Sequence, residues 1–308
     1  MKQSYIKTTF RGFFFIAIKI IITTNCFAQE PKTELLEMMP EIPSEINEPS
    51  QRAEYLVMHF WDKFDFRDTS FLMTDHLLER SFVDYIDLLS IVPYETTEKS
   101  INTLMKKTEG KHSIFSFILK LSEQYLYEPA SPLCNEEKLI PFLQYALQSS
   151  LLDGTEKIRP AFLLESITKN RIGTMANDIT YTLINREAGN LHSVKADYTL
   201  LYFNDPECED CIMLIKQLIT SSVINNLINQ GKLKILTVYV NDDVEAWEKH
   251  ASDVSDLWIY SRDAEQKINI EGIYNIKQFP TMYLLDIDKK ILLKDTTFEN
   301  LENYFRMF

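Results

Sequence analysis

The sequence TLLYFNDPECEDC, residues 199–211, sets the architecture of the C-terminal half of this chain. It opens with a short, continuous apolar run, which is typical of a strand buried on both faces of a parallel sheet. A polar loop with one proline follows, and Cys208 then begins a helical pattern in which Cys211 lies one turn further on. The stretch therefore predicts a strand, a loop and a helix that starts at a C-x-x-C pair.

The placement of the two cysteines favours redox chemistry. Only a thiolate attacks a disulfide, and the unpaired amides and positive end of a helix N-terminus stabilise a thiolate at Cys208. Cys211 lies on the same helix face and can close a disulfide with Cys208. Two cysteines without a nearby histidine make a poor zinc site, and Ile212 stands where haem attachment requires histidine. A static structural disulfide and a degenerate redox site remain alternatives.

The segments around this pair alternate between strands and helices, which predicts an α/β domain with a mixed sheet over residues 172–308. A hairpin is expected to turn at Glu187–Asn190, between strands near 179–183 and 191–194. Further strands are expected at 199–203, 233–240, 257–260, 281–286 and 291–294. Helices are expected at 208–229 (closed by Gly231), 244–251, 264–274 and from the cap Thr297 to 304.

Residues 172–308 resemble the thioredoxin superfamily, specifically the TlpA-like periplasmic thiol-disulfide oxidoreductases. The resemblance rests on the strand, loop and C-x-x-C helix of residues 200–211, on YNIKQFPTMYLLD at 274–286, and on the entry segment Ala176–Ile179. It implies a cis Pro280 that faces the cysteine pair, with Phe279 and Thr281 beside it in the substrate groove. It also implies thiol-disulfide exchange with protein or small thiols, no organic cofactor, and electrons from a partner such as a membrane reductase.

Three positions depart from that family. Glu207 stands where tryptophan usually precedes the first cysteine, Glu209-Asp210 replaces a dipeptide such as Gly-Pro, and Tyr202 replaces the buried carboxylate of thioredoxins proper. The carboxylates around Cys208 oppose thiolate formation, which favours the disulfide form and makes the dithiol a better reductant. We therefore expect a reductant or isomerase rather than a strong oxidant. The alternative is a non-catalytic thioredoxin-like binding or assembly module in the cell envelope.

The N-terminus is typical of an exported protein. Three basic residues precede an apolar run at 12–22, and Cys26-Phe27-Ala28 supplies the small residues of a cleavage site. We expect residues 1–28 to be a signal peptide, with an uncleaved anchor or a lipoprotein modified at Cys26 as alternatives. Residues 29–50 form an acidic, proline-rich linker. The predicted location is the periplasm.

Residues 51–171 are expected to form an all-α domain that precedes the thioredoxin-like fold. Apolar residues recur at helical spacing, and the aromatic stripe of Phe60, Trp61, Phe64 and Phe66 is expected in the core. The region resembles the helical domain of unknown function that precedes thioredoxin-like domains in Bacteroidetes proteins. Detailed expectations are a helix from a Thr97 cap to Gly110, a start or kink at Pro141, and a last helix from Pro160 that buries Phe162, Leu163 and Ile167.

Composition restricts the function further. The chain has 308 residues, of which 45% are apolar and only 7 are glycine, so it is globular and unsuited to glycine-rich nucleotide-binding loops. Its net charge is −13, and loss of residues 1–28, with four basic and no acidic residues, would make it −17. Such acidity argues against nucleic acid as a partner.

The remaining cysteine and histidines have no pattern of their own. Cys134 is expected to be a partly buried spectator, with a disulfide to another chain as the alternative. Five histidines are scattered without ligand spacing, and residues 286–290 lack a full series of calcium ligands, so no metal site is predicted.

Overall fold

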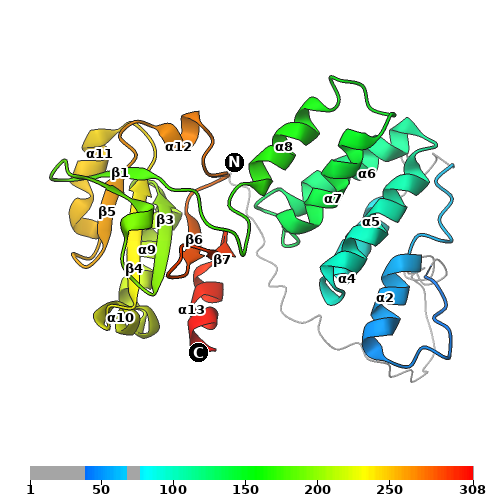
Figure 1. Cartoon of the computed structure of the whole chain (residues 1–308), viewed down its shortest axis with the longest axis horizontal. Helices are drawn as coiled ribbons and strands as arrows, with labels where there is room; N and C mark the ends of the chain where they lie inside the picture. Colours follow the sequence, from blue (N-terminus) through cyan, green and yellow to red (C-terminus); the bar gives the residue numbers. More distant parts are fainter. Residues whose placement is uncertain (1–38, 68–76, 308) are drawn as a thin grey trace, which may run out of the picture. The chain divides into compact units, whose positions relative to one another are not determined.

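The computed structural model of the chain describes residues 39–67 and 77–307 (Figure 1). These residues belong to one compact unit, which begins at Met39. The predicted signal peptide, its cleavage point and Cys26 lie outside the described residues. No single helix in 39–67 or 77–307 is long and apolar enough to cross a membrane, although one bent pair of helices meets the criteria of length and composition together.

Every described element between Pro49 and Thr168 is helical, as predicted (Figure 1). The four aromatic residues of the predicted stripe are all buried, which confirms their place in the core. The indole of Trp61 meets the rings of Phe64 and Tyr85 edge-on, with 5.4 Å between centroids in both pairs. The elements are α2 (Pro49–His59), α4 (Leu77–Leu88), η1 (Leu89–Ile91), α5 (Tyr94–Thr108), α6 (His112–Leu126), α7 (Glu136–Gln148) and α8 (Ile158–Thr168).

Three details of this helical region differ from the prediction. Helix α5 begins at Tyr94, because Pro93 supplies the break, and Thr97 is buried within it rather than capping it. Of the two alternatives for Pro141, a helix start is excluded: the side chain of Asn135 caps α7 by accepting from Lys138 N at 3.2 Å, and Pro141 lies inside the helix. Phe162 is 62% exposed, because the buried stripe of α8 passes through Leu163 and Ile167 instead.

The C-terminal region holds a seven-stranded mixed sheet, with strand order β2-β1-β5-β4-β3-β6-β7. The pairs β3–β4 and β4–β5 are parallel, and the remaining neighbours are antiparallel. This confirms the predicted fold class, a thioredoxin-like mixed sheet flanked by helices and preceded by an all-helical region. The strands are β1 (Thr180–Leu183), β2 (Ala188–Asn190), β3 (Tyr198–Asn204), β4 (Leu233–Tyr239), β5 (Ile259–Arg262), β6 (Thr281–Leu285) and β7 (Ile291–Lys294).

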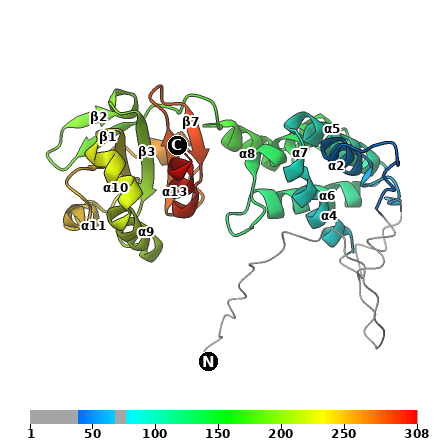
Figure 2. The ribbon, with the colours of Figure 1, turned by 90° about the horizontal axis from the view of Figure 1, so that it is seen from below.

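Helices cover both faces of this sheet (Figures 1 and 2). Successive side chains of a strand point to opposite faces, so Leu200 and Tyr202 pack in one core cluster with residues of α9, α10 and α13. Leu201 and Phe203 pack in the other cluster, with residues such as Tyr274. The elements are α9 (Glu209–Thr220), α10 (Ser222–Asn229), α11 (Val244–Lys249), α12 (Lys267–Ile270) and α13 (Phe298–Arg306), with short 3₁₀ turns η2 (Leu191–Ser193) and η3 (Ala251–Asp253).

Two helices near the sheet differ from their predicted bounds. The single helix predicted over 208–229 is two helices with a 65° bend, because the side chain of Ser221 caps the second by accepting from Ile224 N. Only Lys267–Ile270 is helical within the predicted 264–274. The predicted cap at Thr297 is confirmed, since its side chain accepts from Asn300 N.

Two strands also differ from their predicted bounds. The expected turn at 187–190 is wrong: Ala188–Asn190 is strand β2, and the chain reverses just before it, where Arg186 has a φ of 71°. The strand expected at 257–260 lies two residues later, as β5.

Candidate functional site

Cys208 lies at the junction between a polar loop and α9, where it occupies the N-cap position. Its side chain is half-buried and Cys211, one turn into the helix, is fully buried. Both are free thiols in this structure. The thiol of Cys208 donates to the carbonyl of Phe279 over 3.8 Å. Cys208 thus contacts a segment 71 residues away in sequence.

That segment contains the expected proline, and the Phe279–Pro280 peptide bond is cis. Strand β6 pairs antiparallel with β3, so Thr281 lies opposite Phe203, close to the point where β3 runs into the cysteine loop. The hydroxyl of Thr281 donates to Gln278 O at 2.7 Å, within the loop that holds the proline. Sheet topology therefore brings the expected groove residues, 279–281, to the end of the sheet at which Cys208 lies.

Asp205 organises the loop that presents Cys208, a role that sequence reasoning missed. Its Oδ1 accepts from Glu207 N at 3.0 Å, and its carbonyl accepts from Cys208 N at 3.1 Å. Its Oδ2 accepts from the Asn241 amide at 2.9 Å, which ties the loop to the end of β4. Aspartate before a proline and a helix start is a common turn former, and that signal was available in Asp205-Pro206.

The environment of Cys211 disfavours its thiolate. Burial raises the pKa of Cys211 to about 12, and the backbone amide of Asp205 and the hydroxyl of Tyr202 offset only part of that effect. Tyr202 also donates its hydroxyl to Cys211 O at 3.2 Å. At neutral pH Cys211 is therefore protonated; its side chain is buried, whereas that of Cys208 is half-buried.

Carboxylates gather beside the cysteine loop. A cavity of about 450 Å³ is lined by Asp205 and Glu207 from the loop and by Asp242 and Asp243 after β4. In the parts of the chain that the structure describes, three or more histidine, cysteine or acidic side chains nowhere converge as metal ligands would. Two loops therefore contribute carboxylates to this cavity.

The third described cysteine lies on the opposite side of the proline loop. Cys134, expected to be partly buried, is instead an exposed residue immediately before the α7 cap, and its thiol lies 3.9 Å from Lys277 Nζ. Burial of the thiol itself raises the pKa of Cys134. Several predicted spectator histidines pair with neighbouring acids, as His112 does with Glu156 at 2.7 Å.

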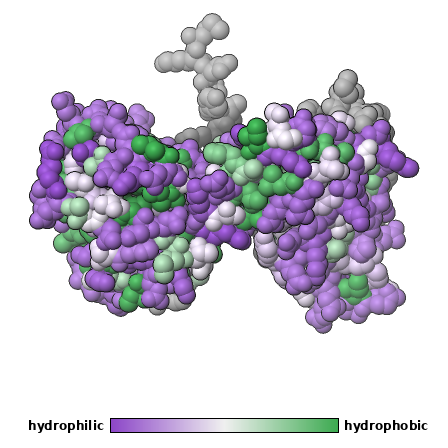
Figure 3. All heavy atoms as spheres, turned by 45° about the horizontal axis from the view of Figure 1, so that its top comes forward, coloured by the Kyte–Doolittle hydropathy of each residue, from purple (hydrophilic) through white to green (hydrophobic). Residues whose placement is uncertain are grey.

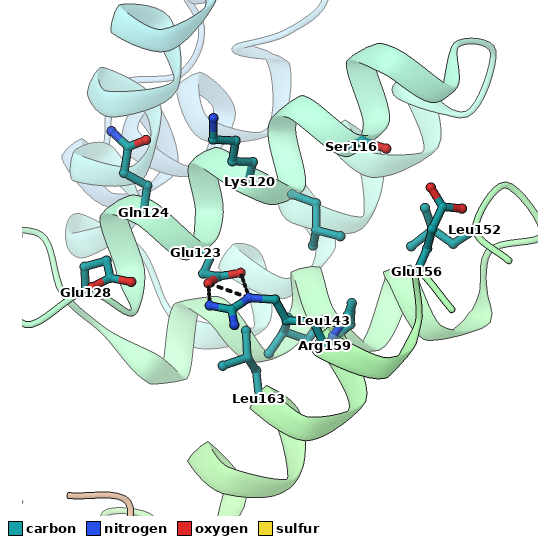
Figure 4. A pocket seen from close by; sticks show the side chains of 12 residues that line it. Ser116, Lys120, Glu123, Gln124, Glu128, Leu143, Leu152, Glu156, Arg159 and Leu163 are labelled. Atoms are coloured by element: carbon teal, nitrogen blue, oxygen red, sulfur yellow. Dashed lines mark hydrogen bonds and ion pairs between the residues drawn. The ribbon is translucent and has the colours of Figure 1, made fainter. Parts of the chain in front are cut away.

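A second cavity, of about 550 Å³, lies within the helical region (Figure 4). Its floor is apolar, with Leu143, Leu152 and Leu163, and the guanidinium of Arg159 binds the carboxylate of Glu123 at its centre. Ile158 is 66% exposed on the same helix as Arg159. Figure 3 shows apolar surface gathered where α8 lies.

A comparison with known protein families divides the chain near residue 170, close to the boundary predicted between residues 171 and 172. A family model described as a domain of unknown function (DUF5106) matches residues 22–170. None of the curated proteins is significantly similar in sequence.

Solved structures extend the likeness over both regions. A thioredoxin-like protein from Bacteroides caccae is 38% identical, with a TM-score of 0.85 over 87% of this chain and 97% of its own. The C-terminal domain of an uncharacterized protein from Bacteroides fragilis is 40% identical over 45% of this chain and 99% of its own, with a TM-score of 0.45. The thioredoxin domain of a thiol-disulfide oxidoreductase from Bacteroides vulgatus is 23% identical over 45% and 97%, with a TM-score of 0.39.

Proposed function

Because this chain belongs to the thioredoxin-like proteins, we propose that it is a thiol-disulfide oxidoreductase that acts through Cys208 and Cys211. The observation that carries the proposal is the juxtaposition at the helix start. A half-buried Cys208 thiol lies 3.8 Å from the carbonyl that precedes the cis Pro280, and a buried Cys211 lies one turn away. In this proposal Cys208 is the thiol that a client can reach, and the buried Cys211 is the thiol that later resolves the mixed disulfide.

The proposed reaction begins when the Cys208 thiolate attacks one sulfur of a client disulfide. A mixed disulfide forms, and the departing client sulfur takes up a proton. Cys211 then attacks the Cys208 sulfur as its own proton leaves to solvent or to the departing group, and the second client thiol is released. The client gains two electrons, and the Cys208–Cys211 disulfide remains.

The same acidic surroundings support a reducing or isomerising direction. Asp205, Glu207, Glu209 and Asp210 flank Cys208 in the sequence, and negative charge near a redox-active cysteine pair favours its disulfide form. In this proposal the protein works in the periplasm on protein or small-thiol clients and receives electrons from a membrane partner. We also propose that the protein is of the TlpA-like periplasmic type.

The test is to equilibrate a chain that begins after Ala28 with glutathione buffers and measure the potential of the cysteine pair, together with its reduction of insulin. We expect turnover and a potential at or below about −270 mV, the value of thioredoxin. A potential near about −120 mV, typical of strong oxidants, would refute the direction. Cys211→Ser should accumulate mixed disulfides with clients, whereas the matched control Cys208→Ser should not.

A non-catalytic binding or assembly module is the second candidate. The cavity of the helical region and the exposed Ile158 and Phe162 favour it, because contiguous apolar surface often marks a binding site. In that case the cysteine pair would stay oxidised through the buffer series and turn over no client. The glutathione titration thus separates the two candidates.

A further inference from the structure

A cavity of about 330 Å³ is lined in part by the proline loop. The loop and its flanks contribute Gln278, Pro280 and Thr281 to its lining. The helical region contributes the start of α7, with Asn135 and Glu136. The expected groove residues therefore face a hollow that the sheet region encloses only in part.

Glu136 connects the two sides of this cavity. Its carboxylate is 8% exposed and lies 3.0 Å from Lys277 Nζ through Oε1 and 2.6 Å from Lys294 Nζ through Oε2. The amide of Asn275 also donates to Oε1, at 3.2 Å. The side chains of the two lysines are only 10% and 8% exposed. Removal of one member of such a set leaves buried charge uncompensated.

The local sequence explains why a buried carboxylate is stable here. The Asn135 cap starts α7, so Glu136 lies in its first turn, where the helix dipole favours negative charge. Burial alone would lower the pKa of Lys277, but the neighbouring Glu136 raises that pKa above its ordinary value. Lys277 further donates to Tyr127 O at 3.1 Å and lies 4.6 Å above the Tyr127 ring. The start of the proline loop is therefore fastened to the helical region.

We propose that α7 forms one wall of the client-binding groove, and that Glu136 is the positioning residue that holds the Phe279–Pro280 loop against it. This inference rests on the function proposed above. The occupant is the polypeptide segment that flanks the client's disulfide. A client sulfur bound to Cys208 would lie next to the Phe279 carbonyl, and the next two residues of that loop, Pro280 and Thr281, line the cavity.

The size and lining of the cavity fit that occupant. A volume of about 330 Å³ is near the lower end for ligand pockets, so it admits a few residues of an extended chain and not a folded domain. The amides of Asn135 and Gln278 and the charged groups along its rim suit hydrogen bonds to a polar main chain.

The test compares Glu136→Gln with wild type on two substrates, insulin and a small aromatic disulfide. We expect KM for insulin to rise roughly 5- to 10-fold, because the loop is no longer held in place, with kcat and the small-disulfide rate unchanged. Amide hydrogen exchange of residues 275–281 should accelerate in the variant. Glu95→Gln is the control, since Glu95 forms an exposed pair with Lys99 and loses the same charge.

Asn275→Ala removes the contact from the loop side and tests the same claim if Glu136→Gln does not fold. If the wild type turns over normally, and Glu136→Gln matches Glu95→Gln in both insulin KM and hydrogen exchange, this inference is overturned. The proposed function would still stand. Absence of wild-type turnover on either substrate would overturn the proposed function, and the client groove with it. A parallel loss on both substrates would also contradict the inference, because it would point to the reacting thiols and not to client binding.

Discussion

Tyr202 replaces a residue that the thioredoxin superfamily uses for proton transfer. Its hydroxyl donates to Cys211 O and lowers the pKa of the Cys211 thiol against the larger effect of burial. Burial also raises the pKa of Tyr202 itself, far beyond any physiological range, so the phenol stays protonated. Tyr202 therefore acts as a hydrogen-bond donor and not as a base, and the proton of Cys211 must leave by another route.

Tyr202→Phe should raise the pKa of Cys211 further and slow its attack on the mixed disulfide. The variant should also lose about 1 kcal/mol of stability, the net contribution of one hydrogen bond. Alkylation of Cys211 against pH in a Cys208→Ser background measures the first effect, and urea unfolding measures the second. Tyr283→Phe is the matched control, because the Tyr283 hydroxyl is buried on the neighbouring strand without a hydrogen-bond partner. Equal behaviour of the two variants would contradict the role given to Tyr202.

Ser221 determines where one helix ends and the next begins. Its hydroxyl accepts from Ile224 N at 3.2 Å and lies 2.5 Å from the carboxylate of Glu302 in α13. The 65° bend between α9 and α10 depends on that cap, which lets α10 and α13 pack on the same face of the sheet.

Ser221→Ala should destabilise the protein by about 1 kcal/mol, the usual cost of a lost N-cap. Urea unfolding monitored by circular dichroism gives the free energy. Ser222→Ala provides the comparison, because Ser222 is exposed and lies within α10. A loss of the same size in both variants would mean that the cap contributes nothing of its own.

The elements that could be predicted from the sequence are those with a local signal. The apolar run of β3, the C-x-x-C helix start and the Thr297 cap each carry their information within a few residues, and all three were predicted correctly. The helix break at Ser221 was missed because apolar periodicity continues through it, and Glu302, which pairs with Ser221, is 81 residues away. The hairpin turn was misplaced onto β2 because Gly189 resembles a turn residue, although it lies in that strand opposite Tyr181.

The candidate site divides along the same line. Cys208, Cys211, Phe279, Pro280 and Thr281 were expected, because the two motifs lie in recognisable sequence contexts. The role of Glu136 beside the proline loop was not expected. Nothing in the first turn of α7 indicates that this carboxylate pairs with lysines more than a hundred residues further along the chain. Long-range pairing of this kind is set by tertiary packing and leaves no local pattern.

At the scale of the whole molecule, Asp295 links stability to pH. It faces Glu136 from α7, Lys277 from the proline loop and the adjacent Lys294. Burial, followed by Glu136, raises the pKa of Asp295 from its ordinary 3.8 to about 6. Because the folded state holds this proton more tightly than the unfolded chain, its stabilising effect is complete below the unfolded pKa. That effect is lost as the pH rises through about 6.

Asp295→Asn should therefore flatten the dependence of the unfolding free energy on pH between 4 and 7. At pH 7.5 the variant should match or exceed the wild type, by about 1–2 kcal/mol at most since the side chain is partly solvated. Urea unfolding at pH 4.5 and pH 7.5 checks this. A wild type that instead gains stability across this range, with the variant unchanged, would show that Asp295 is held ionised.

The buried carboxylate of Glu136 also bears on the order in which the protein matures. Synthesis proceeds from the N-terminus, and 141 residues separate Glu136 from Lys277, the first of its two lysine partners along the chain. At about 5–20 residues per second, α7 exists for roughly 7–28 s before the lysines that will surround it. During that interval the carboxylate is hydrated, and the helical region can complete its own core but not this face. The ion pairs of Glu136 with Lys277 and Lys294 therefore form late, after the C-terminal strands have been synthesised.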